Sequence, residues 1–315
     1  MHILARSIAF LLIFALILTS IPALAASDPV SRLVTLPSGE ALRVTTLGTG
    51  EPVILIPGLF GSAYGFRKVM PGLADAGWQA IVIEPLGVGG SGRPADADYS
   101  LTAQADRIAA TLHALGIEHA IVVAHSVGAS MAYRLAYRHP ERVTALVSIE
   151  GGVAEAAATP GFRRAMRFAP LIKLFGKGFV RGKIRGQLAA GSADPAWVTD
   201  EVVDGYTGGA LADLGGTIKA YQRMARSPEP EALTPRLGDV RCPVRLLLGA
   251  ARHDGGPSPS DVELLTQKVP NIEVERVPAA GHFIFEEAPA AVVGAVARAA
   301  KDDEARRTAA AGTKP

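Results

Sequence analysis

A chain of 315 residues, 49% of them hydrophobic and 20% charged, is long enough for one large hydrophobic core or for one core with an insertion. Its formal net charge of +2 gives no strong positive field, so nucleic acid is not an expected partner. Cys242 is the only cysteine, which excludes an internal disulfide and a cysteine-rich metal site.

The N-terminal residues have the pattern of a secretory signal peptide. Residues 1–6 carry a positive charge, residues 8–18 are all apolar, and a small-x-small cleavage signal ends at Ala25. A membrane span needs about 20 apolar residues, so we expect cleavage after Ala25 or Ala26, with an uncleaved membrane anchor as the alternative. Residues 1–25 are thus predicted to direct export, to the periplasm or as a secreted protein.

The first half of the mature chain alternates between apolar runs and helix-like segments. The apolar runs predict six strands, at residues 32–36, 41–47, 52–56, 79–83, 120–124 and 143–149. The helix-like segments between the later strands are 64–76, 100–115 and 129–138. This alternation indicates a parallel sheet with helices on both faces, and such sheets bind ligands outside the carboxyl ends of their strands.

The alternation stops in residues 152–237, which are helical in character and interrupted by prolines. We interpret them as a helical cap or lid inserted into a core formed by residues 30–151 and 238–300. The core resumes with strands at 244–248 and 272–277 and a closing helix at 286–299. The polar, alanine-rich residues 301–315 are expected to be a disordered tail.

The basic cap, residues 156–193, contains eight basic residues, no acidic residue and four interleaved phenylalanines. An aromatic face that covers a pocket while the charges face water would explain this pattern. The alternative is a basic surface that contacts anionic lipid or acidic substrates. In both cases the phenylalanines suit an apolar acyl or aryl group.

The candidate chemistry is organised around Ser126. An apolar run stops at this serine and a helix-like sequence begins at once, so Ser126 is predicted to lie at a sharp strand-to-helix turn. The pattern is G-x-S-x-G with Ala124 in place of the first glycine. The small side chains of Ala124 and Gly128 permit the tight turn that exposes the serine oxygen at the sheet edge.

A serine hydroxyl needs a base that takes its proton and an acid that orients the base. In this type of sheet the chain order is serine, acid, histidine. His282, in a glycine-flanked loop after the last predicted strand, is the expected base. Asp254, after the strand at 244–248, is the favoured acid, and Glu150 is the alternative because it ends the strand after the nucleophile's helix.

The remaining expectations concern groups around these three residues. Acyl transfer passes through a tetrahedral oxyanion that needs N–H donors. Val127 offers one backbone N–H, and Leu59 or, alternatively, Phe60 offers another from the loop after residues 52–56. His125 adjoins the nucleophile, but its side chain is expected to point away from Ser126. His253 is a weak rival to His282.

Together these motifs resemble the α/β-hydrolase superfamily, in particular its members with a helical cap. The resemblance covers about residues 30–300. It rests on PGLFG at 57–61, EPLGVGGS at 84–91, AHSVG at 124–128, Gly249 with Asp254, and GHF at 281–283 with EEAP at 286–289. Pro57, Glu84 and Ala124 depart from the residues that are usual at these positions. Some cap-bearing relatives take their acid from the position of Glu150.

The resemblance implies an α/β-hydrolase fold and a serine hydrolase that cleaves a carboxylic ester, or a similar acyl bond, of an apolar small molecule. It implies no metal and no organic cofactor. Dehalogenases and epoxide hydrolases of this superfamily use an aspartate nucleophile, so Ser126 argues against both. C–C bond hydrolysis, lactone opening or cofactor-free perhydrolysis in the same site are alternatives, as is a non-catalytic or membrane-associated binding protein.

Overall fold

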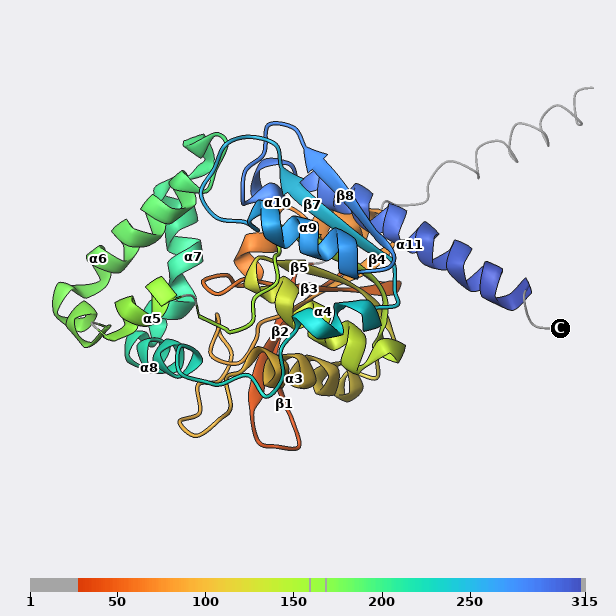
Figure 1. The fold of residues 1–315 in the computed structure, drawn as a ribbon. Helices are drawn as coiled ribbons and strands as arrows, with labels where there is room; N and C mark the ends of the chain where they lie inside the picture. The colour runs from red at the N-terminus through yellow and green to blue at the C-terminus, as the bar shows by residue number, and fades with distance from the viewer. Residues whose placement is uncertain (1–27, 159, 168, 313–315) are drawn as a thin grey trace, which may run out of the picture.

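A computed structural model of the chain describes residues 28–158, 160–167 and 169–312 (Figure 1). The predicted signal peptide and its cleavage site lie outside these residues. Among the helices of the described part, none has the length and apolar character needed to cross a bilayer.

An eight-stranded sheet forms the centre of the molecule, in the order β1-β2-β4-β3-β5-β6-β7-β8. The strands are β1 (Val30–Thr35), β2 (Ala41–Leu47), β3 (Glu51–Ile56), β4 (Trp78–Ile83), β5 (Ala120–His125), β6 (Val143–Ile149), β7 (Val244–Gly249) and β8 (Ile272–Val277). The pairs β1·β2 and β2·β4 are antiparallel, and every later pair is parallel. The mostly parallel α/β sheet predicted from the sequence is therefore confirmed.

Helices cover both faces of this sheet (Figure 1). They are η1 (Ala63–Phe66), α2 (Met70–Asp75), α3 (Leu101–Ala114), α4 (Val127–Arg138), η2 (Pro140–Arg142), η4 (Thr234–Asp239), α9 (Pro259–Lys268), α10 (Ile284–Glu287) and α11 (Pro289–Gly312). The packing of β3 explains why the residues of this strand from Pro52 to Ile56 are all apolar. Ile54 and Ile56 pack into the core that includes α3 and α4, whereas Val53 and Leu55 pack into the core that includes α2 and α11. Successive side chains of a strand point to opposite faces, so a strand between two helix layers is apolar on both.

Between β6 and β7 the chain forms a helical segment, residues 160–224, that lies beside the sheet in Figure 1. Its elements are α5 (Pro160–Arg167), α6 (Ala169–Ala190), η3 (Pro195–Trp197), α7 (Asp200–Ala212) and α8 (Leu214–Met224). Part of the basic charge expected on this segment is neutralised within it. Arg181 forms an ion pair with Asp204, and Arg185 forms one with Asp200. The acids of α7 thus offset two of the cations of α6.

The C-terminal residues differ from the expected disordered tail, because α11 continues as a helix to Gly312. Two acidic residues anchor this extension. Asp302 pairs with Arg245 of β7, and the carboxylate of Asp303 is buried and paired with Arg306 and Arg307. These ion pairs hold polar residues in the helix that composition alone assigns to a tail.

Candidate active site

Ser126 lies at the turn between β5 and α4, as predicted, with a backbone conformation of φ 54° and ψ −125°. Three non-glycine residues of the described part have positive φ: Ser126, Glu150 and Ala279. Such a conformation costs about 1–3 kcal/mol and persists only where the surroundings impose it. Here the Ser126 N–H donates to the carbonyl of Ile149 at 2.9 Å, which ties the turn to the end of β6.

The turn is packed tightly against the loop that follows β3. A Cβ atom on Gly128 would lie 2.8 Å from the carbonyl oxygen of Pro57 and 3.0 Å from that of Ile56. Only glycine permits this approach, since a methyl group would force the two backbones apart. The close contact brings the start of α4, with Val127, beside the loop that carries Leu59.

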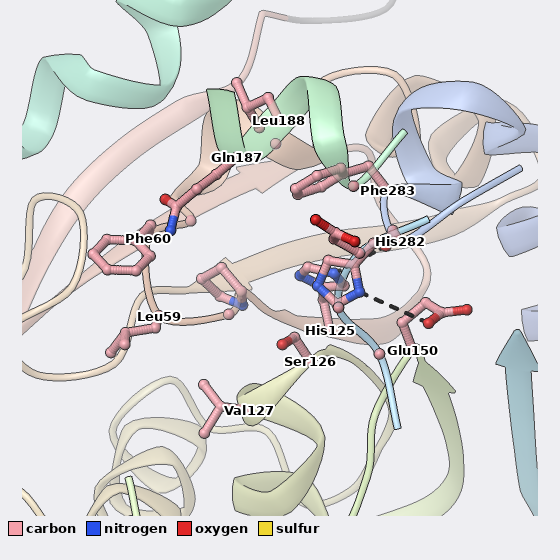
Figure 2. A pocket seen from close by; sticks show the side chains of 18 of the residues that line it. Leu59, Phe60, His125, Ser126, Val127, Glu150, Gln187, Leu188, His282 and Phe283 are labelled. Carbon is pink, nitrogen blue, oxygen red and sulfur yellow. Dashed lines mark hydrogen bonds and ion pairs between the residues drawn. The ribbon is translucent and has the colours of Figure 1, made fainter. Parts of the chain in front are cut away.

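A cavity of about 1100 Å³ opens at the carboxyl ends of the strands. Ser126, Glu150 and His282 all line it, and Figure 2 shows them together on one side of the cavity. Gln187 and Leu188 of α6 lie across from them. The cavity is also lined by aromatic and aliphatic side chains, including Phe60, Phe162, Ile184, Phe283 and Phe285. The arrangement gives a polar reacting centre inside a largely apolar pocket.

Glu150 is the carboxylate that the structure brings to His282. Its Oε2 lies 3.7 Å from His282 Nδ1, the interaction dashed in Figure 2. The residue is only 3% exposed, and its Oε1 accepts a hydrogen bond from the Gly249 N–H at the end of β7. The positive φ of Glu150 is a second strained position in the same site. Strain of this kind concentrates at functional positions, which favours Glu150 as the acid.

Asp254, the acid favoured from the sequence, is not placed beside the base. Its residue is exposed on the cavity wall, and among the described residues no hydrogen bond or ion pair joins its carboxylate to a histidine. The register of the sheet explains why Glu150, and not Asp254, lies beside His282. In the β5·β6 pair His125 lies opposite Ile149, so Ser126 and Glu150 leave the sheet side by side. Asp254 lies five residues beyond the end of β7, out in the following loop.

His253, which the sequence analysis ranked below His282 as a candidate base, is a direct neighbour of Glu150. Its Nε2 lies 3.1 Å from Glu150 Oε2, and its Nδ1 lies 2.8 Å from the carbonyl oxygen of Ala251. One carboxylate therefore faces two histidines, His253 and His282. The adjacency of His253 to Asp254 in the chain was the only sequence signal, whereas in the structure its ring contacts Glu150.

His125 packs against the candidate base. The two ring centroids lie 4.5 Å apart, and His125 Nε2 is 3.1 Å from the carbonyl oxygen of His282. Because that oxygen only accepts, the Nε2 of His125 must donate. Burial, together with the nearby His282 ring, holds the pKa of His125 well below the ordinary value of histidine. His125 is therefore a neutral support of the loop that carries His282.

This depressed pKa makes stability depend on pH. Below about pH 6.5 unfolded His125 binds a proton that the native residue does not, so stability is lost as the pH falls, by up to about 1.4 kcal/mol per pH unit. We expect His125→Gln to reduce this slope in urea unfolding measured between pH 5 and pH 7.5. His119→Gln, at an exposed position, should keep the wild-type slope. Equal slopes in all three proteins would contradict the assignment.

The loop expected to supply oxyanion donors is held by a residue that sequence reasoning missed. The Tyr221 hydroxyl of α8 donates to the carbonyl oxygen of Leu59 at 2.6 Å, and its ring packs edge-on against Phe60 with centroids 5.1 Å apart. Burial raises the pKa of Tyr221, so the hydroxyl keeps the proton it donates. Leu59 and Val127 both line the cavity. Val127 opens α4, and the first N–H groups of a helix have no partner within it.

Comparison with known proteins identifies the family of this site. A family model described as alpha/beta hydrolase fold matches residues 51–196. The chain is 43% identical over 104 residues to a 2-hydroxymuconate semialdehyde hydrolase of a Pseudomonas species, a match that covers 32% of this chain and 36% of that protein. It is 28% identical over 240 residues to RutD of Azorhizobium caulinodans, provisionally named a carbamate hydrolase, covering 75% and 85% of the two chains.

Solved structures give the same result over a longer span. Cfl2 of Burkholderia cenocepacia superposes with a TM-score of 0.70 at 26% identity, covering 85% of this chain and 94% of that one. A thermophilic esterase of Thermogutta terrifontis superposes with a TM-score of 0.69 at 23% identity, covering 88% and 99%, a likeness that shows the fold alone. The matches to the first curated relatives span only 21% to 44% of the lengths of those proteins.

Proposed function

The chain belongs to the α/β-hydrolase superfamily, and from its site we propose that it is a serine hydrolase that cleaves a carboxylic ester or similar acyl bond. One observation carries the proposal. Ser126, with its strained backbone, lines the same cavity as His282, and the buried carboxylate of Glu150 lies beside His282. This is the arrangement that activates a hydroxyl for attack on a carbonyl carbon.

The proposed reaction proceeds in two halves. Nδ1 of His282 faces Glu150, which leaves Nε2 to take the proton of the Ser126 hydroxyl as its oxygen attacks the acyl carbon. The protonated ring then gives this proton to the leaving alcohol, and an acyl-enzyme remains. In the second half the same nitrogen takes a proton from water as the hydroxide attacks the acyl carbon. The bond from this carbon to the Ser126 oxygen then breaks, the acid leaves, and the protonated ring returns its proton to Ser126. The Ser126 side chain makes no capping hydrogen bond to α4, so its hydroxyl is free to turn towards His282.

The backbone N–H groups of Leu59 and Val127 are proposed to hold the oxyanion, with Phe60 as the alternative to Leu59. Donors that are fixed before the reaction stabilise charge without a reorganisation cost. Two contacts support this fixation: the Tyr221 bond to Leu59 and the approach of Pro57 to Gly128.

The pocket supports an apolar acyl or aryl substrate. Phe60 and Phe162 pack edge to face with ring centroids 6.0 Å apart, and both line the cavity. Because Phe162, Ile184 and Leu188 come from α5 and α6, we propose that the helical segment is the lid that sets substrate shape. Burial of a hydrocarbon group among these apolar side chains is favourable by about 25 cal/mol per Å² of apolar surface removed from water.

A second candidate is hydrolysis of a C–C bond beside a carbonyl group. The 43% identity over 104 residues to a 2-hydroxymuconate semialdehyde hydrolase favours it, since this match has the higher identity of the two curated relatives described above. The same serine, base and oxyanion donors serve both reactions, so the distinction lies in the substrate.

A substrate series distinguishes the two candidates and tests the lid. We expect p-nitrophenyl esters from acetate to decanoate to be hydrolysed with a preference for medium chains, and turnover of a ring-fission dienoate to be at least 10-fold slower. Phe162→Ala should shift the preference towards longer acyl chains, because it removes an aromatic wall of the cavity. Ser260→Ala, on the exposed surface of α9, is the matched control. Faster turnover of the dienoate than of every ester would replace the ester proposal by the C–C one.

A further inference from the structure

We propose that Glu150, His253 and His282 form a binding site for a divalent transition-metal ion, with Zn²⁺ as the best fit. One ligand atom from each residue lies within 4.8 Å of the other two. Glu150 Oε2 is 3.1 Å from His253 Nε2 and 3.7 Å from His282 Nδ1. Two imidazoles and one carboxylate are a donor set that suits zinc and not the oxygen-preferring Mg²⁺ or Ca²⁺.

The spacing of the three atoms is close to that of a tetrahedral zinc site. Bonds of about 2.0–2.1 Å from zinc to nitrogen and oxygen separate neighbouring ligand atoms by about 3.3 Å. The distances of Glu150 Oε2 to the two imidazole nitrogens bracket this value. The two imidazole nitrogens lie within 4.8 Å of each other, so the rings must rotate to bring them closer and complete three corners of the tetrahedron, with water at the fourth.

The hydrogen bonds around Glu150, His253 and His282 leave the carboxylate of Glu150 facing imidazole nitrogens. Ala251 offers a carbonyl oxygen, so His253 Nδ1 must be the donor in their 2.8 Å contact. A neutral His253 ring then presents a lone pair at Nε2, facing a carboxylate oxygen 3.1 Å away. His282 Nδ1 is also buried without a hydrogen-bond partner among the described residues. When His282 carries its proton on Nε2, three electron-pair donors converge at this point, and a cation between them, either a proton or a metal ion, relieves their repulsion.

The outer contacts match those that orient metal ligands. A ligating histidine usually donates its other N–H to a carbonyl or carboxylate, as His253 does to Ala251. A ligating carboxylate is usually held by a further hydrogen bond, as Glu150 Oε1 is by the Gly249 N–H. Both contacts leave Oε2 and Nε2 directed at the proposed ion.

A thin cover of main chain gives the ion an entry path. Gly255 and Gly256 lie over the cluster with φ of 96° and 78°, and both are exposed. A Cβ on Gly256 would lie 2.0 Å from Glu150 Oε2, and one on Gly255 would lie 3.1 Å from His282 Nδ1. Two exposed glycines thus lie next to the site.

A bound ion would inhibit the hydrolase. With Nδ1 of His282 bound to metal, the neutral ring carries its proton on Nε2, so that nitrogen cannot accept the proton of Ser126. This consequence rests on the proposed function, whereas binding itself rests on the cluster alone. The ion acts here as a reversible inhibitor and not as a cofactor.

The test measures binding without using activity. Untagged Ser126→Ala protein is titrated with Zn²⁺ by calorimetry and with Co²⁺ by its visible absorption. We expect one ion per chain and a tetrahedral Co²⁺ spectrum. Adding His253→Gln or, as a second variant, His282→Gln should weaken binding at least about 100-fold. Adding His119→Gln, at an exposed position, should leave it unchanged.

Two results would overturn the site: no stoichiometric binding, or binding that survives both histidine substitutions. The cluster would then be held by a proton on His253. Inhibition of the wild-type enzyme by Zn²⁺, reversed by EDTA and relieved in His253→Gln, is the expected functional result. A wild-type protein that hydrolyses no ester would refute the proposed function, while the titration would still decide the metal site.

Discussion

Ser126→Ala is expected to lower kcat/KM for ester hydrolysis by about 10⁵-fold or more, on the scale found when the serine of such a catalytic unit is removed. The reason is that Ser126 supplies the hydroxyl at the strained turn between β5 and α4, in the cavity that His282 and the proposed oxyanion donors also line. Initial rates on p-nitrophenyl butyrate and labelling with a fluorophosphonate probe measure the effect. The circular dichroism spectrum should be unchanged.

Ser130→Ala is the matched control for this loss. Ser130 lines the same cavity, but its hydroxyl already donates to the carbonyl of Gly152 and accepts from the Ala154 N–H, both at 2.9 Å. It should keep fluorophosphonate labelling, whereas Ser126→Ala should lose it. Labelling that persists in Ser126→Ala would remove the nucleophile assignment.

Glu150→Gln is expected to lower kcat by about 10³–10⁴-fold, the scale seen when the acid of a serine triad becomes its amide. The amide has the shape of the carboxylate and can still accept from Gly249, so the local fold is kept. It lacks the negative charge that stabilises the protonated His282 ring. Its NH₂ group can also donate to Nδ1 of His282, which favours the tautomer with the proton on Nε2 and leaves no base for Ser126. Steady-state kinetics on a soluble ester give the measurement.

Asp254→Asn is the control that decides between the two acids. Because this carboxylate is exposed and contacts no histidine among the described residues, the variant should stay within about threefold of wild type. If Asp254→Asn were crippled and Glu150→Gln active, the loop after β7 would have to rearrange when substrate binds. Glu150 would then have a structural role only.

Local chemistry explains why much of the fold was predictable. Apolar runs at 52–56, 79–83 and 120–124 are buried strands because a sheet between two helix layers excludes polar side chains from both faces. The turn at Ser126 follows from small residues at a strand-to-helix junction. The loop position of His282 follows from its flanking glycine. Each of these features depends on neighbours in the chain, so the pattern of residues carries it.

The choice between the two candidate acids depended on contacts between distant parts of the chain. Chain order allowed both Asp254 and Glu150, and only the pairing of β5 with β6 decides that Ser126 and Glu150 emerge together. The same holds for His253, which reaches Glu150 across 103 positions of sequence, and for Tyr221, which reaches Leu59 across 162. Composition also assigned residues 301–315 to a disordered tail, whereas residues up to Gly312 form a helix in which Asp302 pairs with Arg245.

By itself, then, the sequence determined the sheet, the nucleophile turn and the histidine loop, since periodicity and turn chemistry act over a few residues. The tertiary structure alone decided which carboxylate faces His282, what holds the loop that carries Leu59 and which second histidine contacts Glu150. Those choices depend on strand register and side-chain direction. A one-residue change of register in β6 would turn Glu150 to the other face of the sheet while leaving the sequence pattern as it is.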